Sequence, residues 1–242
     1  MKKSCVSLLM QKGTVKNYTR ETFKSKEDWL KHRGLGGSSA SAILGKNPYM
    51  SKLELYRAIV MPNKNPLTKQ NESMYYGTRC EPLIRKLFAY DHKDMYRVHS
   101  PKDNEMYRRI DKPYMTATLD GILTEKGTRR KGILEVKTHD VRNRKDEEEW
   151  KDHIPENYYI QVLHYLLVMN DCEYVVLTAK LRFFDYFNAD GKKLIKTEIR
   201  YYYIDRNDER IQKDLAFLEK KETEFWEENV QKKVMPTLKF KF

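Results

Sequence analysis

The first third of the chain has the hydrophobic spacing of helices. Ser25 is placed to cap a helix that extends to His32, and Ser51 begins a capping box before a second apolar stretch. A longer helical pattern covers residues 73–90 and is preceded by a glycine-rich turn at 34–39. The apolar stripe predicted for this long helix consists of Leu83, Ile84, Leu87 and Phe88. We therefore expect the N-terminal third to be helical.

The middle of the chain changes to the alternation and turn residues that are typical of strands, and helical spacing returns later. Asp190-Gly191 joins two long strand-like runs and is a strong hairpin signal. The predicted strands are 105–110, 115–123, 131–138, 173–187 and 194–204, and the predicted helices are 156–169 and 207–231. We expect the three shorter strands to form an antiparallel meander. The pattern as a whole predicts an α+β fold in which helices flank a central mixed β-sheet.

The cysteine content and the lack of long apolar stretches exclude several classes of protein. The 242 residues include three scattered cysteines, Cys5, Cys80 and Cys172, which are too few for a disulfide framework or a four-cysteine metal site. The apolar run within residues 1–10 is too short for a signal peptide, and no stretch approaches the length of a membrane span. We therefore expect a cytoplasmic protein with reduced thiols and no membrane partner.

Positive charge changes the picture, because the net charge of +12 suggests a polyanionic partner. Two basic segments, 129–131 and 142–145, flank the apolar run 132–136. Basic groups on both sides of one short strand suggest that phosphates bind near this strand.

The same strand carries candidate chemistry. Glu135 and Lys137 are two residues apart, so their side chains share one face of a strand. Alone, this pair is also explained as an ion pair on an exposed edge strand. However, Asp120 precedes a glycine on the preceding predicted strand, and a hairpin would bring Asp120 close to Glu135. Two carboxylates, a backbone carbonyl and a phosphate oxygen suit magnesium, and an adjacent lysine can orient water or offset negative charge. This set suits hydrolysis of a phosphodiester bond.

The order of these groups resembles that of the PD-(D/E)XK nuclease superfamily and, within it, the lambda-exonuclease-like, YqaJ-type viral recombinase family. The resemblance covers residues 29–169 and implies a restriction-endonuclease-like core. The catalytic residues that it implies are Glu81, Asp120, Glu135, Lys137 and Gln161. The metal ligands that it implies are Asp120, Glu135, the carbonyl of Val136 and Glu81, for Mg²⁺ with Mn²⁺ as the alternative. Leu119 stands where the superfamily name has proline.

A second motif, at residues 29–45, resembles the part of the family that holds the end of DNA. By this resemblance Arg33 and Ser38 bind the terminal 5′-phosphate, although Ser39 occupies a position where an acid is more common. Arg142 and Arg144 follow the catalytic strand and are candidates for further DNA contacts.

The resemblance implies a metal-dependent 5′-to-3′ exonuclease that acts on linear double-stranded DNA in phage-type recombination. It also implies a homotrimer and a single-strand annealing protein as a partner. We expect one nuclease domain over 1–242, with a DNA-end-binding part at 25–92, a catalytic core at 93–204 and a C-terminal helix at 205–232. The alternatives are an endonuclease or single-strand nuclease of the same superfamily and a non-catalytic nucleic-acid-binding module.

Overall fold

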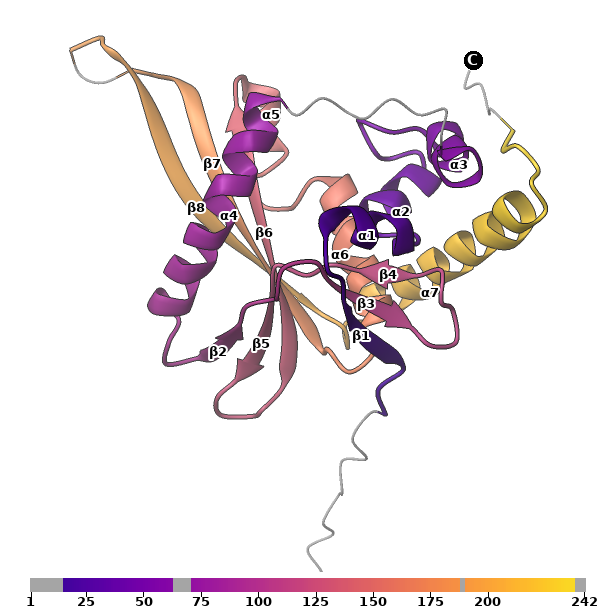
Figure 1. Cartoon of the computed structure of the whole chain (residues 1–242). Helices are drawn as coiled ribbons and strands as arrows, with labels where there is room; N and C mark the ends of the chain where they lie inside the picture. Colours follow the sequence, from indigo (N-terminus) through magenta and orange to yellow (C-terminus); the bar gives the residue numbers. More distant parts are fainter. Residues whose placement is uncertain (1–14, 63–70, 188–189, 238–242) are drawn as a thin grey trace, which may run out of the picture.

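The structure is a computed structural model that describes residues 15–62, 71–187 and 190–237 (Figure 1). The N-terminal apolar run with Cys5, and Asn188 and Ala189 of the predicted hairpin turn, lie outside the described residues. Within the described ranges, none of the helices combines the length and the apolar character that a membrane-spanning segment requires.

A five-stranded mixed sheet forms the centre of the molecule, with the strand order β2-β5-β6-β7-β8. Only β6 and β7 pair in parallel among these neighbours, and the other pairs are antiparallel. The strands are β2 (Tyr96–His99), β5 (Gly121–Glu125), β6 (Lys131–Val141), β7 (Tyr174–Phe187) and β8 (Lys193–Asp205). A second sheet contains β1 (Tyr18–Thr22), β3 (Glu105–Arg109) and β4 (Thr116–Ala117).

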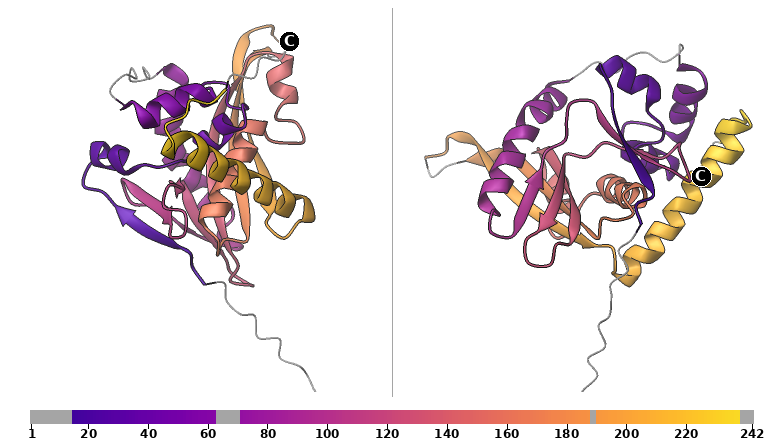
Figure 2. Two further views of the ribbon diagram at one scale, coloured as in Figure 1. Left: turned by 90° about the vertical axis from the view of Figure 1, so that its right-hand side faces the viewer. Right: turned by 60° about the horizontal axis from the view of Figure 1, so that its bottom comes forward.

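Helices cover both faces of the larger sheet (Figure 2). The helices are α1 (Lys26–His32), α2 (Gly37–Ile43), α3 (Lys52–Val60), α4 (Glu72–Asp91), α5 (Arg144–Glu148), α6 (Glu156–Val168) and α7 (Glu209–Glu224), and α7 continues as a π-helical segment, Phe225–Gln231. On one face, Ile84 and Phe88 of α4 pack against Leu134 and Val136 of β6. On the other face, α6 packs against the opposite side of β6 and β7. This arrangement confirms the α+β prediction of a mixed sheet flanked by helices.

Local sequence signals account for the helix starts. The Ser25 hydroxyl accepts a hydrogen bond from the N–H of Asp28 and begins α1. Ser51 and Glu54 form the predicted capping box of α3, in which each side chain accepts a hydrogen bond from the other residue's N–H. Each cap pairs an N–H group that the helix itself leaves without a partner.

Several predicted details are wrong. The segment 115–123 does not form one strand, because it supplies β4 to the smaller sheet and β5 to the larger one. Both antiparallel pairings of the predicted meander are present, as β3–β4 and β5–β6, but they belong to two different sheets. Leu83 and Leu87 are exposed, so the buried stripe of α4 is narrower than the spacing predicts. Strands β1 and β2 fall outside every predicted strand.

The β7–β8 hairpin extends beyond the body of the molecule, at the upper left of Figure 1. Its strands pair from Tyr174↔Asp205 outward, with a register shift between Phe183 and Tyr186. The exposed apolar side chains near its outer end are Phe187, Leu194 and Ile195. This hairpin confirms the two long predicted strands.

Candidate active site

The candidate site lies where β5 and β6 separate. Gly121 is the first residue of β5 and pairs with Leu134, so the next residues of β6 have no partner on the β5 side. Asp120 lies in this opening, and its Oδ2 accepts a hydrogen bond from the N–H of Val136 at 2.7 Å. Because the N–H and C=O of one strand residue point to the same side, the Val136 carbonyl also faces the opening. The predicted hairpin therefore brings Asp120 next to Glu135.

Glu135 is the central side chain of the site and is almost completely buried. Its Oε1 lies 2.6 Å from Nζ of Lys137 and accepts a hydrogen bond from Nε2 of Gln161 at 2.8 Å. Its Oε2 is buried and receives no hydrogen bond from the described part of the chain. A buried carboxylate oxygen without a donor is costly, so this atom is available to a ligand that carries positive charge.

Glu81 approaches the site from α4 but has a partner of its own. Arg85 lies one helical turn further on, forms an ion pair with Glu81 at 3.0 Å, and donates a hydrogen bond to the carbonyl oxygen of Asp120 at 2.7 Å. Arg85 thereby ties α4 to the start of β5. Glu81 is thus placed beside the site, whereas Asp120 and Glu135 form its centre.

The carboxylates of the site repel one another when charged, which raises their pKa values. Burial raises the pKa of Asp120 well above its usual value, and the neighbouring Glu135 and Glu81 carboxylates raise it further. Burial also raises the pKa of Glu135, although Lys137 opposes this shift. Burial alone would lower the pKa of Lys137, but Glu135, Tyr165 and Asp120 outweigh it and raise the pKa above the usual value. Lys137 therefore stays protonated and supplies one positive charge to an acidic site.

The donor set fits a hard divalent cation through two side chains and one carbonyl. No group of three or more His, Cys, Asp or Glu side chains is arranged as a metal site within residues 15–62, 71–187 and 190–237. Asp120 and Glu135 nevertheless lie side by side, the Val136 carbonyl faces the same opening, and Glu135 Oε2 has no hydrogen-bond partner. Oxygen ligands of this kind are those that Mg²⁺ binds, with water completing the shell. Of the four ligands implied by sequence, Glu81 is ion-paired with Arg85, at the side of the site and not at its centre.

The two residues predicted to bind the 5′-phosphate lie together next to this site. Nη2 of Arg33 donates a hydrogen bond to Oγ of Ser38 at 3.4 Å, and its guanidinium lies over the ring of Trp29 at 5.2 Å. Both Arg33 and Ser38 are exposed, and Arg33 forms no ion pair with a described residue. A Cβ on Gly36 would lie 3.0 Å from Nη2 of Arg33, so a glycine here leaves room for the guanidinium.

Gly37 connects this pair to the catalytic side chains. A Cβ on Gly37 would lie 2.5 Å from Cγ of Gln161 and 2.9 Å from Cε1 of Tyr165. Helix α2 can therefore approach α6 this closely only because residue 37 has no side chain. Gly36 therefore lies against Arg33 and Gly37 lies against Gln161, at the start of the same helix.

We predict that Gly37→Ala destabilises the protein by about 1–3 kcal/mol, the range for an overpacked contact, and displaces Gln161 from Glu135. The measurement is urea unfolding of both proteins. Gly127→Ala is the matched control, because a Cβ at Gly127 meets no atom within 4 Å. Equal unfolding free energies for the two variants would contradict the predicted contact.

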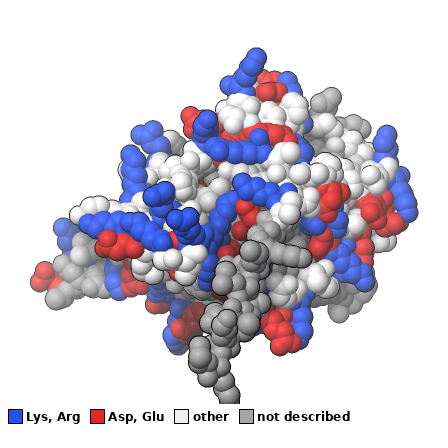
Figure 3. Space-filling view, turned by 90° about the horizontal axis from the view of Figure 1, so that it is seen from below, with Lys and Arg blue, Asp and Glu red and all other residues white. Residues whose placement is uncertain are grey.

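The basic segments at the two ends of β6 differ from the sequence interpretation. Arg130 is bound by Glu173 and Asp205, and Lys131 is bound by Asp171, so these cations are neutralised within the chain. Of the predicted phosphate-binding segment 129–131, Arg129 is exposed and forms no ion pair with a described residue, so one cation of the segment keeps its charge free. Figure 3 shows Lys and Arg spread over several parts of one face and interleaved with Asp and Glu. Charge alone therefore does not locate a DNA surface.

The other basic segment, 142–145, keeps exposed positive charge. Arg142 forms an ion pair with Asp140 at 3.2 Å but stays 65% exposed, and Arg144 is exposed without an ion pair to a described residue. Both lie at the end of β6 and the start of α5, away from Asp120 and Glu135 along the strand. Arg142 and Arg144 therefore lie outside the centre of the candidate site.

The sequence analysis missed two further residues of the site. The hydroxyl of Tyr165 accepts a hydrogen bond from Nε2 of Gln161 at 2.7 Å, and burial, followed by Glu135, raises its pKa. The second is Arg85, which holds Glu81. Each lies four residues after a predicted site residue on the same helix, and residues four apart share a helix face. This spacing is the signal that would have identified both.

Comparisons with known proteins identify the family of this chain. Residues 28–173 match the model of the YqaJ-like viral recombinase domain. The chain is 32% identical over 210 residues to the uncharacterized protein YqaJ of Bacillus subtilis, across 85% of this chain and 57% of that protein. The chain thus spans little more than half the length of this relative.

The fold resembles that of the alkaline exonuclease LHK-Exo from Laribacter hongkongensis. The TM-score is 0.50 at 18% identity, and the match covers 86% of this chain and 97% of that one. Both molecules have the restriction-endonuclease-like fold. Because the family model covers more than half of the chain, including Glu81, Asp120, Glu135 and Gln161, this protein belongs to the YqaJ-like viral recombinase family.

Proposed function

We propose that this protein is a metal-dependent deoxyribonuclease that degrades linear double-stranded DNA from its 5′ end. The observation that carries the proposal is the part of β6 that has no partner on the β5 side. Asp120, Glu135 and Lys137 meet there, beside the Arg33–Ser38 pair. Membership of a viral recombinase family supports a role in DNA recombination. The fold shared with an alkaline exonuclease supports phosphodiester hydrolysis.

Asp120, Glu135 and the Val136 carbonyl would hold the metal ion, with Mg²⁺ proposed first and Mn²⁺ as the alternative. When bound, a divalent ion of this kind polarises a phosphoryl oxygen and lowers the pKa of a water ligand. Oε1 of Glu81 is paired with Arg85, so we propose that Glu81 contributes negative charge from beside the site.

Lys137 and Gln161 would orient the attacking water and the scissile phosphate. Lys137 carries a proton in this site, so its proposed role is to offset negative charge that develops on the phosphate. Gln161 donates hydrogen bonds to Glu135 and Tyr165 and would hold the Glu135 carboxylate in position. The water gives up a proton as its oxygen bonds to phosphorus, the bond to the 3′ oxygen breaks, and that oxygen takes up a proton, so no net proton is gained or lost at this bond.

This chemistry regenerates the group that Arg33 and Ser38 would bind. Cleavage at the 3′ oxygen releases a nucleotide and leaves a new 5′-phosphate on the shortened strand. The same pair can then engage the next end, which suits repeated cleavage along one strand. We further propose, from the family resemblance, that the chain acts as one nuclease domain in a homotrimer with a single-strand annealing protein as partner.

The experiment is digestion of linear duplex DNA with and without a 5′-phosphate, beside a covalently closed circle, in Mg²⁺ and in EDTA. We expect loss of the linear phosphorylated DNA only in Mg²⁺. Arg33→Gln should remove the preference for phosphorylated ends, because it removes the charge that faces the phosphate. Arg97→Gln is the matched control, since Arg97 is exposed and forms no ion pair with a described residue.

The outcomes separate the parts of the proposal. Cleavage of the closed circle would contradict end-dependence and support an endonuclease with the same site. Binding of DNA without Mg²⁺-dependent cleavage would contradict the nuclease and leave a binding module. An equal effect of Arg33→Gln and Arg97→Gln would contradict the assigned 5′-phosphate contact.

A further inference from the structure

A second basic feature lies outside the candidate active site. It is a groove of about 670 Å³ between α5 and the base of the β7–β8 hairpin, in the upper part of Figure 1. Its volume is within the range that holds small organic ligands of nucleotide size, about 300–1,000 Å³. The residues that carry its chemistry are Arg142, Arg144, Lys151, Phe183, Lys196 and Arg200.

The groove carries more positive than negative charge. Five cationic side chains line it, against two acids, Glu147 and Glu148. Three of the cations pair with acids outside the lining, Arg142 with Asp140 and both Lys196 and Arg200 with Glu198. Arg144 and Lys151 are exposed and form no ion pair with a described residue, so their charge is not neutralised within the described chain. Phosphate groups are the common biological anions that such a set binds along a strand.

An aromatic ring adds a second type of contact. Phe183 is half-buried in the groove, with Nζ of Lys196 5.6 Å and the guanidinium carbon of Arg200 5.9 Å from the ring centroid. Cations around an aromatic side chain are the combination by which proteins hold single-stranded nucleic acid, since bases stack on the ring while phosphates meet the cations. A duplex hides its base faces within the helix, so this pairing of groups favours an unpaired strand.

The groove and the candidate active site lie along the same face of the sheet. Val141 pairs with Phe183 and Lys137 pairs with Ala179, so Phe183 lies on the same face as Lys137 and Glu135. Four strand residues separate Lys137 from Val141, which corresponds to about 13 Å at about 3.3 Å per residue. This is the length of about four stacked nucleotides at about 3.4 Å each. The buried Trp150 lies near His139, with ring centroids 5.6 Å apart, between the site and the groove.

We propose that this groove binds a single-stranded stretch of DNA next to the site of cleavage. The proposal rests on the proposed nuclease function for its substrate. The occupant is the strand left unpaired when its complement is digested. Arg144 and Lys151 contact its phosphates, and Phe183 stacks on one of its bases.

The test measures binding of a fluorescently labelled oligothymidine with a 5′-hydroxyl to the full chain in EDTA, over a range of salt concentrations. These conditions stop cleavage and avoid the 5′-phosphate contact. Arg144→Ala/Lys151→Ala should weaken binding and make the slope of log K against log salt shallower by about 1.4, since each contact to a single strand contributes about 0.7.

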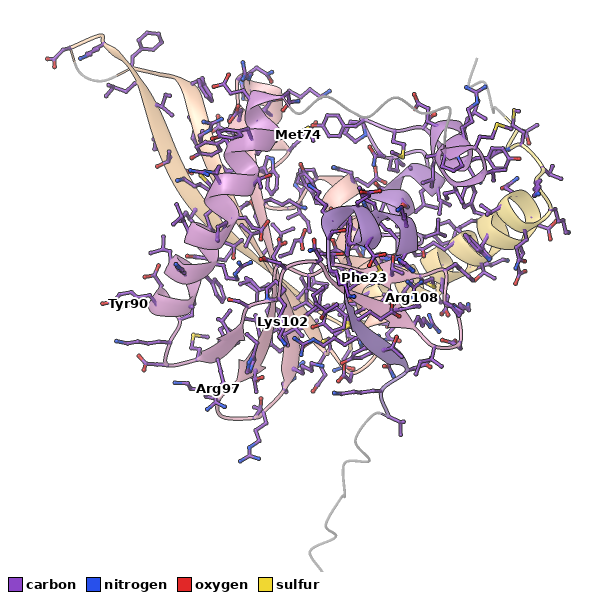
Figure 4. The ribbon with its side chains drawn as sticks, viewed as in Figure 1. Phe23, Met74, Tyr90, Arg97, Lys102 and Arg108 are labelled. Carbon is purple, nitrogen blue, oxygen red and sulfur yellow. The ribbon has the colours of Figure 1, made fainter. Side chains whose placement is uncertain are left out.

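The matched control is Arg97→Ala/Lys102→Ala. These two cations are also exposed and lack ion pairs to described residues, and Figure 4 labels them in the lower part of the molecule, away from the hairpin. The control should keep the wild-type slope. An equal change in both double variants would overturn the proposal, because binding would then reflect overall charge.

Phe183→Leu tests whether the groove binds a single strand and not a duplex. It keeps the apolar packing of Phe183 against the core and removes the aromatic face. We expect about 5-fold or greater loss of affinity for oligothymidine and no change for a blunt duplex. Thermal unfolding of each variant verifies the fold. Equal affinity of wild type and Phe183→Leu for oligothymidine would overturn the stacking role. An equal loss of affinity for oligothymidine and for the duplex in Phe183→Leu would overturn the single strand as the occupant.

Failure of this proposal is distinguishable from failure of the nuclease. A chain that binds oligothymidine through the groove but cleaves no DNA in Mg²⁺ contradicts only the nuclease. A chain that cleaves linear duplex DNA while the groove variants bind like wild type contradicts only the groove.

Discussion

Replacing Lys137 with alanine should lower the rate of DNA cleavage by about 10²–10⁴-fold, the range for loss of a positioned catalytic group. Lys137 is the one cation that lies in direct contact with Glu135 among the described residues, at 2.6 Å. Its raised pKa keeps it charged, so alanine removes positive charge where negative charge develops on the phosphate. The measurement is the initial rate on linear duplex DNA at saturating Mg²⁺.

Lys131→Ala is the matched control for this variant. Lys131 lies on the same strand and forms a comparable ion pair with Asp171 at 2.8 Å, at the end of β6 that is remote from the opening. Both variants lose an ion pair, and only Lys137→Ala should lose cleavage. The catalytic role would be refuted if Lys137→Ala cleaved DNA at a rate within about 3-fold of the Lys131→Ala rate. Such a difference is well under the 10-fold change in rate that about 1.4 kcal/mol represents.

The second large effect concerns a buried ion pair that joins α6 to α7. Nδ1 of His164 lies 2.9 Å from Oε1 of Glu222, and Nε2 lies 2.9 Å from the carbonyl oxygen of Thr116. Both side chains are completely buried. His164→Leu should destabilise the protein by about 3–5 kcal/mol, because it leaves Glu222 buried without its partner. Urea unfolding measures this loss.

The pH dependence of this pair has a defined sign. Burial lowers the pKa of His164, but the Glu222 carboxylate and the Thr116 carbonyl outweigh it, so the pKa lies above its usual 6.5. A group whose pKa is raised in the folded state contributes its full stabilisation at pH values below its pKa in the unfolded state. Its contribution is lost as pH rises through the folded value. The unfolding free energy of the wild type should therefore exceed that of His164→Leu most below about pH 6.5, and the difference should shrink at higher pH.

A double variant separates the pair from simple packing. His164→Leu/Glu222→Leu removes both charged groups, so it should be more stable than His164→Leu alone. Additive losses in the double variant would indicate that packing, and not the buried charge, causes the effect. A pH-independent difference between wild type and His164→Leu would also contradict the protonated histidine.

Features that depend on neighbouring residues could be predicted from the sequence. Ser25 and Ser51 cap helices because a hydroxyl reaches an N–H a few residues away. Glu135 and Lys137 share a face because side chains alternate along a strand. Asp120 meets Glu135 because a short turn joins their strands. The fold class and the centre of the site follow from these local rules.

Features that depend on distant partners could not be predicted in this way. The segment 115–123 has one strand pattern, yet its two ends join different sheets, because Thr116 pairs with Arg108 and Gly121 pairs with Leu134. Leu83 and Leu87 have helical apolar spacing, but the described part of the chain leaves them exposed.

Tertiary structure also decided which cations are neutralised by acidic side chains. Arg130 and Lys131 lie as close to the catalytic strand as Arg142 and Arg144 do in sequence. They are neutralised because Glu173, Asp205 and Asp171 fold against them. The sequence by itself determined which groups could share a strand or a helix face, since backbone periodicity sets those positions. Only the tertiary structure decided which of them stayed available to a ligand, because an acid remote in sequence can neutralise a cation only after the chain has folded.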